Sequence, residues 1–158
     1  MDLKIGDKAP LFCLPNQDNA EVCLRDFKGM WVIVYFYPKD KTPGCTQEAC
    51  DFRDNLQSLE SLGAVVLGIS PDSPKTHQSF IDKESLNFTL LSDTTKETLK
   101  AYGAWGTKKL YGKEYEGVIR SSFIINPKGE IAYLWRQVKV KGHIKALQEK
   151  LKALQADK

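Results

Sequence analysis

The chain has 158 residues, 42% of them hydrophobic, and a formal net charge of +3 at pH 7. This length and apolar content predict one compact α/β domain over residues 1–158 with a substantial core. Charged side chains such as Asp2, Lys4 and Lys8 interrupt the first ten residues, and no apolar run approaches membrane-spanning length. We therefore expect a soluble, cytoplasmic protein without a signal peptide or a membrane partner.

The first half of the chain is predicted to hold a hairpin, then a strand, a helix and a second strand. Two short segments, Phe12–Leu14 and Val22–Leu24, flank a polar turn and suit the arms of a hairpin. The run Trp31–Tyr37 contains only β-branched and aromatic side chains, which is typical of a central strand. A helix is expected over Cys45–Leu62, and Ala64–Ile69 is the next buried strand.

The second half is predicted to contain helices first and a strand pair later. A helix over Lys75–Glu84 follows a proline-rich turn, and a shorter helix is expected over Lys96–Tyr102. The strands Ser121–Asn126 and Glu130–Gln137 are joined by a Pro-Lys-Gly turn. Strands alternating with helices, then a late hairpin and a terminal helix, predict a central mixed sheet with helices on both faces.

Lysines in the closing segment supply much of the net positive charge. Ile144, Leu147, Leu151 and Leu154 repeat in that segment at helical spacing, which leaves the lysines for the solvent face of an amphipathic helix. No aromatic residues interleave with these lysines. We therefore expect no nucleic-acid partner.

A cysteine stands where the central strand gives way to a helix. The strand ends at Pro38, Pro43 and Gly44 enforce a turn, and Cys45 then falls in the first helical turn. Unpaired N–H groups and the positive end of the helix dipole favour an anion there. The sequence therefore predicts a reactive thiolate at Cys45.

These residues resemble the active-site motif of the peroxiredoxins, Pro-x-x-x-Thr-x-x-Cys, here Pro38, Thr42 and Cys45. The extension Thr-Pro-Gly-Cys-Thr-x-Glu-Ala-Cys is similar to the peroxiredoxin Q, or bacterioferritin comigratory protein, subfamily. The segment Arg120–Ile125 is similar to that subfamily's Arg-Ser-Thr-Phe strand. The resemblance runs from about Ile5 to the last helix, and it implies a thioredoxin-like fold with an N-terminal hairpin extension.

The resemblance also implies a role for the residues of the motif. Cys45 would be the peroxidatic nucleophile, attacking the weak O–O bond of a peroxide as a thiolate. Arg120 would lie beside it, where a guanidinium that never titrates can hold the thiolate and then the peroxide oxygens. The Thr42 hydroxyl would accept from the incoming peroxide and donate to the sulfur.

Further neighbours complete the expected pocket. Pro38 would pack over the thiolate and limit water, and the N–H groups of Gly44 and Cys45 would point into the substrate site. Glu48, one helical turn after Cys45, is expected to orient Arg120 or cap the turn, since a peroxide needs no strong base. Singly, these residues also suit ordinary turn or surface roles, but their joint spacing favours catalysis.

Cys50 is the expected resolving cysteine. In an unbroken helix, five positions from Cys45 give ~7.5 Å of rise and about 140° of rotation, which separates the Cα atoms by roughly 8 to 9 Å. A disulfide spans at most about 7 Å, so forming Cys45–Cys50 requires this part of the helix to unwind. The alternative is an inert, buried Cys50. No cysteine follows Cys50, so the C-terminal resolving cysteine of obligate-dimer peroxiredoxins is absent, which permits a monomer.

The other cysteines and the histidines suggest structural roles. Cys13 and Cys23 alternate with core-facing neighbours on the hairpin arms and would face each other if the arms pair symmetrically about Asp18. We expect structural residues, with a disulfide under oxidation as the alternative. The cysteine spacings do not match zinc motifs, and His77 and His143, far from any cysteine, are expected at the surface or at helix ends.

Together these patterns predict a cysteine peroxidase that reduces hydrogen peroxide and small organic hydroperoxides. Thioredoxin is the expected reductant, and the sequence carries no metal, haem, flavin or nicotinamide signature. Two alternatives stay open, namely a one-cysteine enzyme that uses an external thiol and a thiol redox sensor with little turnover. A thioredoxin-type disulfide oxidoreductase would need a two- or three-residue interval between its cysteines, which this chain lacks.

Overall fold

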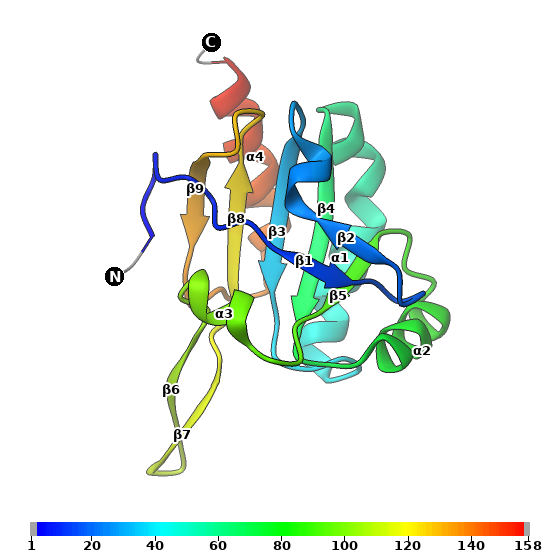
Figure 1. Ribbon diagram of the computed structural model, residues 1–158, viewed down its shortest axis with the longest axis vertical. Coiled ribbons are helices and arrows are strands. Elements are labelled where there is room, and N and C mark those ends of the chain that lie inside the picture. Colours follow the sequence, from blue (N-terminus) through cyan, green and yellow to red (C-terminus); the bar gives the residue numbers. More distant parts are fainter. Residues whose placement is uncertain (1–2, 157–158) are drawn as a thin grey trace.

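The structure of the protein is a computed structural model that describes residues 3–156 (Figure 1). Within those residues the main sheet has five strands in the order β5-β4-β3-β8-β9. They are β3 (Trp31–Phe36), β4 (Ala64–Ser70), β5 (Thr89–Ser92), β8 (Ser121–Ile125) and β9 (Ile131–Trp135). Because β3, β4 and β5 pair in parallel while β8 and β9 pair antiparallel to their neighbours, the sheet is mixed, as the sequence predicts.

The central strand, β3, is buried along its whole length. Its side chains alternate between the two faces of the sheet. Ile33 and Tyr35 pack in one hydrophobic cluster, whereas Val34 and Phe36 pack in the other. Burial on both faces explains why this run is apolar throughout, and it gives the loop that follows Phe36 a fixed starting point.

Helices cover both faces of the sheet, as the sequence predicts (Figure 1). Among the described residues, three helices pack on the Tyr35 face: α1 (Pro43–Ser61), α2 (Pro74–Glu84) and α4 (His143–Ala156). The shorter α3 (Glu97–Ala101) lies on the opposite face, where Leu99 belongs to the same cluster as Phe36 and Phe12. No helix within residues 3–156 is long and apolar enough to cross a membrane.

The N-terminal hairpin consists of β1 (Cys13–Pro15) and β2 (Glu21–Cys23), followed by the 3-10 helix η1 (Leu24–Phe27). Its register places Cys13 opposite Cys23, and a disulfide joins them, which is the alternative that the sequence left open. Cys13 is exposed, but Cys23 is 3% exposed, so the expectation that both sulfurs face away from the core is wrong for Cys23. Burial follows because η1 folds the chain back directly after Cys23.

Two features of the sheet region were not predicted. The short strand β5 carries too few residues for a clear pattern. The hairpin of β6 (Trp105–Leu110) and β7 (Lys113–Val118) projects away from the main sheet (Figure 1). Its polar strands lack alternation, but Tyr111 and Gly112 at its tip both have positive φ, 52° and 77°, as a type I′ turn requires.

Candidate active site

The site begins where β3 ends and α1 starts. Thr42 is the N-cap of α1, with extended backbone, and Pro43 occupies the first helical turn, where its fixed φ and missing N–H are tolerated. The helix therefore begins two residues before the predicted Cys45. The N–H of Thr46 donates to the Thr42 carbonyl at 2.8 Å, so Cys45 lies in the first turn and is 2% exposed.

Arg120 reaches this turn because of the register between β3 and β8. Phe36 pairs with Ser121, so the residue preceding β8 lies at the end of β3 that leads into α1. Arg120 Nη2 donates to Cys45 Sγ at 3.2 Å. The structure thus brings together two residues that are 75 positions apart in the sequence.

Glu48 holds the other side of the guanidinium. Arg120 Nη1 donates to Glu48 Oε1 at 2.5 Å, and Glu48 is 1% exposed. Burial raises the pKa of Glu48 to about 7, although the Arg120 cation opposes that rise. Burial acts against the charge on Arg120, yet Glu48 and Cys45 raise the pKa of Arg120 above its ordinary value. The guanidinium therefore stays charged and is held in one orientation between a carboxylate and a sulfur.

Thr42, Gly44 and Pro38 surround the same turn. The Thr42 hydroxyl donates to the Lys39 carbonyl at 2.9 Å, so in this state its hydrogen is not directed at the sulfur. Its oxygen lone pairs remain able to accept. A Cβ on Gly44 would lie 3.4 Å from Arg120 Nη2, so the bare backbone lets the guanidinium approach closely. Pro38 is half-buried immediately after β3.

Cys50 lies farther along the same unbroken helix. Cys45 and Cys50 are both free thiols, and Cys50 is half-buried. Cys50 Sγ is 3.6 Å from Glu84 Oε1, and Arg53 Nη1 donates to the Glu84 carbonyl at 2.6 Å. Burial, with the negative charge of Glu84 adding to it, raises the pKa of the Cys50 thiol. These contacts connect the middle of α1 to the end of α2.

Sequence reasoning missed a histidine behind Arg120. His143 Nε2 is 2.8 Å from Ser122 Oγ, and the residue is 6% exposed. Burial, with a smaller effect of the Arg120 cation, lowers the pKa of His143 to about 4. His143 does begin a helix, as expected, but it is not on the surface. The signal was its position four residues before Leu147, on the apolar face of α4.

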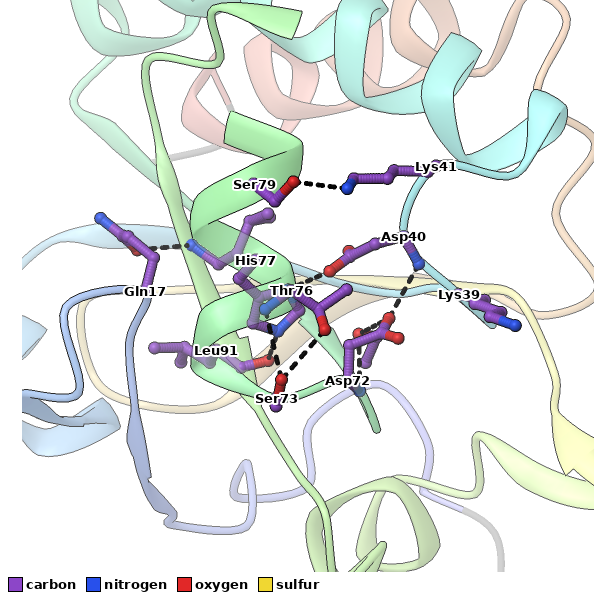
Figure 2. A network of polar contacts seen from close by, with 12 residues as sticks. Gln17, Lys39, Asp40, Lys41, Asp72, Ser73, Thr76, His77, Ser79 and Leu91 are labelled. Carbon is purple, nitrogen blue, oxygen red and sulfur yellow. Dashed lines mark hydrogen bonds and ion pairs between the residues drawn. The ribbon is translucent and has the colours of Figure 1, made fainter. Parts of the chain in front are cut away.

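His77 lies in the first turn of α2, which agrees with the expected helix end, but it is completely buried, so the surface alternative is wrong for it as well. It lies three residues before Phe80, which is buried on the same helix. Its ring contacts Asp40 in the loop between β3 and α1, within the polar network drawn in Figure 2. The sequence therefore missed a polar group that lies directly beneath the loop preceding Cys45.

Two groups of side chains in residues 3–156 are spaced closely enough to be considered as metal ligands. In the first, Cys13 and Cys23 are joined by a disulfide and their sulfurs are not available as thiolates. In the second, the facing atoms of Asp40, Asp72 and His77 already take part in hydrogen bonds with protein groups. Neither arrangement has the character of a metal site.

Comparisons with known proteins agree with this geometry. The family model described as "AhpC/TSA family" matches residues 5–134. Peroxiredoxin Bcp of Bacillus subtilis is 46% identical over 152 residues, covering 96% of this chain and 97% of the relative. Peroxiredoxin Bcp of Escherichia coli is 49% identical over 141 residues, covering 89% and 90%.

Solved structures give the same picture. A cysteine-to-serine mutant of Xylella fastidiosa PrxQ has a TM-score of 0.91 at 38% identity and covers 97% of this chain and 98% of that one. A bacterioferritin comigratory protein of Xanthomonas campestris, whose title concerns alkyl peroxide reduction activity, has a TM-score of 0.86 at 39% identity, with 90% of each chain covered. The chain belongs to the AhpC/TSA family and, within it, to the peroxiredoxin Q or Bcp subfamily. Its fold is thioredoxin-like, and it is a peroxidase, an oxidoreductase enzyme.

Proposed function

We propose that this peroxidase reduces hydrogen peroxide and small organic hydroperoxides through Cys45. The observation that carries the proposal is the hydrogen bond of 3.2 Å from Arg120 Nη2 to Cys45 Sγ in the first turn of α1. The thiolate attacks the outer peroxide oxygen and the O–O bond breaks. A proton joins the leaving oxygen to give alcohol or water, and Cys45 becomes a sulfenic acid.

The residues around Cys45 support this step. Arg120 already binds the sulfur, so its charge can follow the negative charge onto the leaving oxygen. Thr42 and the N–H groups of Gly44 and Cys45 would bind the peroxide, and Pro38 would shield the sulfur. Organic substrates are included because the Xanthomonas campestris relative is titled for alkyl peroxide reduction.

Cys50 would resolve the sulfenic acid. Its thiol sulfur would displace water from the Cys45 sulfenic acid, which forms a disulfide and releases one H₂O. Because α1 is continuous from Pro43 to Ser61, the Cα atoms of the two cysteines are roughly 8 to 9 Å apart, beyond the reach of a disulfide of about 7 Å. The start of α1 would therefore unwind, and the contacts of Cys50 and Arg53 to Glu84 would break.

The remaining parts of the proposal concern the reductant and the state of the protein. A dithiol protein, thioredoxin, would reduce the Cys45–Cys50 disulfide by exchange. Because Cys45 and Cys50 lie in the same helix, resolution would need no partner subunit, which fits a monomer. Recycling by thioredoxin fits a cytoplasmic location. In that reducing compartment a disulfide such as Cys13–Cys23 would be open to reduction.

A coupled assay with thioredoxin, thioredoxin reductase and NADPH tests the proposal. The wild type should consume hydrogen peroxide continuously, while Cys45→Ser should consume none because a serine hydroxyl is not ionised at neutral pH. The double variant Cys13→Ser/Cys23→Ser is the matched control and should keep its turnover. Unchanged turnover in Cys50→Ser would favour the one-cysteine alternative, and a wild type that reacts once and stops would favour the sensor.

A further inference from the structure

The loop between β3 and α1 has a conformation that its own sequence does not fix. Lys41 has a φ of 69°, in the left-handed region that a residue with a side chain rarely adopts. Thr42 directly follows with extended backbone and begins α1. Because Cys45 sits in the first turn of that helix, the position of its sulfur depends on whatever holds this loop in place.

Asp40 is the buried anchor of the loop. It is 4% exposed, and its two carboxylate oxygens have separate partners. Oδ1 accepts from the Tyr37 hydroxyl at 2.5 Å, and Oδ2 lies 2.7 Å from His77 Nδ1. The Asp40 N–H donates to Asp72 Oδ2 at 2.8 Å, and Ser70 also donates to that oxygen (Figure 2).

His77 connects this anchor to the sheet. Its Nε2 lies 2.9 Å from the carbonyl of Leu91 in β5, and since a carbonyl only accepts, Nε2 carries the hydrogen. Its Nδ1 faces Asp40. Both ring nitrogens of His77 are therefore held by protein groups, one by the loop and one by the sheet. His77 thus bridges the loop, α2 and β5.

A second contact from the same helix reaches the next loop residue. Lys41 Nζ donates to Ser79 Oγ on α2, on the outer side of the loop (Figure 2). The Thr42 hydroxyl donates back to the Lys39 carbonyl. Asp40 and Lys41 are therefore both held by side chains of α2. Of these two α2 side chains, His77 is the one that is completely buried.

We infer that His77 is a positioning residue for the peroxidatic cysteine: acting through Asp40, it fixes the loop that places Thr42, the start of α1 and the Cys45 sulfur against Arg120. The inference rests on the proposed function, in which Cys45 is the attacking group. His77 touches neither the sulfur nor the peroxide. A displacement of about 1 Å at a reacting atom can cost ~10²-fold in rate, so loss of the anchor should be visible in the chemical step.

Variants of His77 and Asp40 can separate the effect of losing their contact from the effect of losing the carboxyl group. His77→Leu removes the bridge and leaves the buried carboxyl group of Asp40 with one partner fewer. Asp40→Ala removes the bridge from the other side and leaves no buried carboxyl group behind. Asp40→Asn keeps the bridge, because the amide oxygen can accept from Tyr37 and the amide N–H can donate to Nδ1 of a neutral His77.

The experiment is stopped-flow reduction of the first equivalent of hydrogen peroxide, with amide exchange over residues 39–46 measured on the same proteins. His77→Leu and Asp40→Ala should each slow the reaction at least ~10-fold and raise exchange in that segment, while Asp40→Asn should stay within about threefold of the wild type. Leu99→Ala, a buried truncation on the opposite face of the sheet, should lower the melting temperature without slowing the reaction.

The inference is overturned if His77→Leu reacts within threefold of the wild type, or if Leu99→Ala with a similar loss in melting temperature is equally slow. Should His77→Leu not fold, equal rates for Asp40→Ala and Asp40→Asn would overturn it as well. Failure of the proposed function gives a different result: wild type and Cys45→Ser would then be equally unreactive, while exchange over residues 39–46 would still report whether His77 holds the loop.

Discussion

Half-buried Arg120 and buried Glu48 form an ion pair in which Nη1 lies 2.5 Å from Oε1, directly beside the sulfur that the same guanidinium contacts. The second oxygen of Glu48 has no hydrogen-bond partner within residues 3–156. Burial disfavours the charged carboxylate, most of all when one of its oxygens has no partner, and it is burial that raises the pKa of Glu48. Burial of the Glu48 carboxylate therefore lowers the stability of the protein, but it holds the Arg120 side chain in place.

Glu48 should make the protein less stable as the pH rises. Its pKa in the folded state, about 7, lies above the ordinary 4.5, so the folded state binds the proton more tightly between these values. Between pH 4.5 and pH 7.5 the unfolding free energy of the wild type should therefore fall, relative to that of Glu48→Gln, by on the order of 3 kcal/mol. Urea unfolding across this range measures it, and a constant difference would contradict the prediction.

His143 should have the opposite effect and make the protein more stable as the pH rises. Its pKa is lowered to about 4, so the unfolded state binds the proton more tightly between pH 4 and 6.5. Its contribution to stability is fully present above pH 6.5 and is lost as the pH falls toward 4, by on the order of 3 kcal/mol. His143→Gln should abolish this loss in the same urea titrations. Because Glu48 and His143 offset each other near pH 5 to 6, the wild type alone should show a shallow profile.

Arg120→Ala should leave the fold intact but slow the reduction of the first peroxide equivalent by ~10²- to 10³-fold, by analogy with the loss of one preorganised donor. Arg136→Ala is the matched control. Arg136 is half-buried and donates to the carbonyls of Tyr102 and Gly103, away from Cys45. It should react within about threefold of the wild type in stopped flow. A change of less than threefold in Arg120→Ala would place Arg120 outside the chemistry.

The Cys13–Cys23 disulfide should contribute to stability and not to catalysis. It closes a loop with a sequence separation of 10, for which chain entropy gives about 2–3 kcal/mol. Cys13→Ser/Cys23→Ser should lower the unfolding free energy of the oxidised protein by that amount and leave peroxide reduction unchanged. The same loss should appear when the wild type is reduced with dithiothreitol, and identical denaturation curves with and without the bond would refute the prediction.

The sequence predicted those parts of the molecule in which a local pattern decides the structure. The apolar run of β3 and the proline, glycine and cysteine of the α1 turn specify their own conformation, so strand, turn and helix start were found within two residues. Cys13 was expected to face Cys23 if the hairpin pairs symmetrically about Asp18, as it does, but their disulfide was only the alternative to two structural cysteines. The contact of Arg120 with Cys45 came from the family resemblance, since nothing local joins positions 75 residues apart.

Polar groups that are buried by tertiary packing could not be predicted in the same way. His77 and Asp40 are polar by sequence, and only the docking of α2 against the loop makes them a buried pair. The raised pKa of Glu48 likewise depends on burial that a helical pattern does not report, because Glu48 lies one turn from Cys45 on a helix end that could equally face water. In β7 the residues Lys113–Glu116 are exposed and Val118 at the end of the strand is buried, so β7 lacks the alternation by which strands are recognised.

Cys50 permits the sharpest test of the catalytic cycle. If forming Cys45–Cys50 requires α1 to unwind, one equivalent of peroxide should raise amide exchange and protease cleavage over residues 42–53, while β3 and β4 stay protected. Cys50→Ser should block this change. In that variant the Cys45 sulfenic acid should accumulate, turnover with thioredoxin should fall, and reduction of the first equivalent should stay fast because the contact between Arg120 and Cys45 is untouched.

The contact between Arg53 and Glu84 should affect the rate at which the Cys45–Cys50 disulfide forms. Under the proposed resolving step, the contact at 2.6 Å between Arg53 Nη1 and the Glu84 carbonyl would break before Cys50 reaches Cys45. Arg53→Ala should therefore speed disulfide formation by several-fold without changing the rate of the first step, because one hydrogen bond of a partly exposed side chain contributes about 0.5–1.5 kcal/mol. Quenched-flow trapping of the sulfenic acid in wild type and Arg53→Ala separates the two steps.

If the oxidised wild type keeps an intact α1, or carries a disulfide from Cys45 to Cys13 or Cys23, the resolving role proposed for Cys50 is wrong, although the peroxidase activity itself would stand.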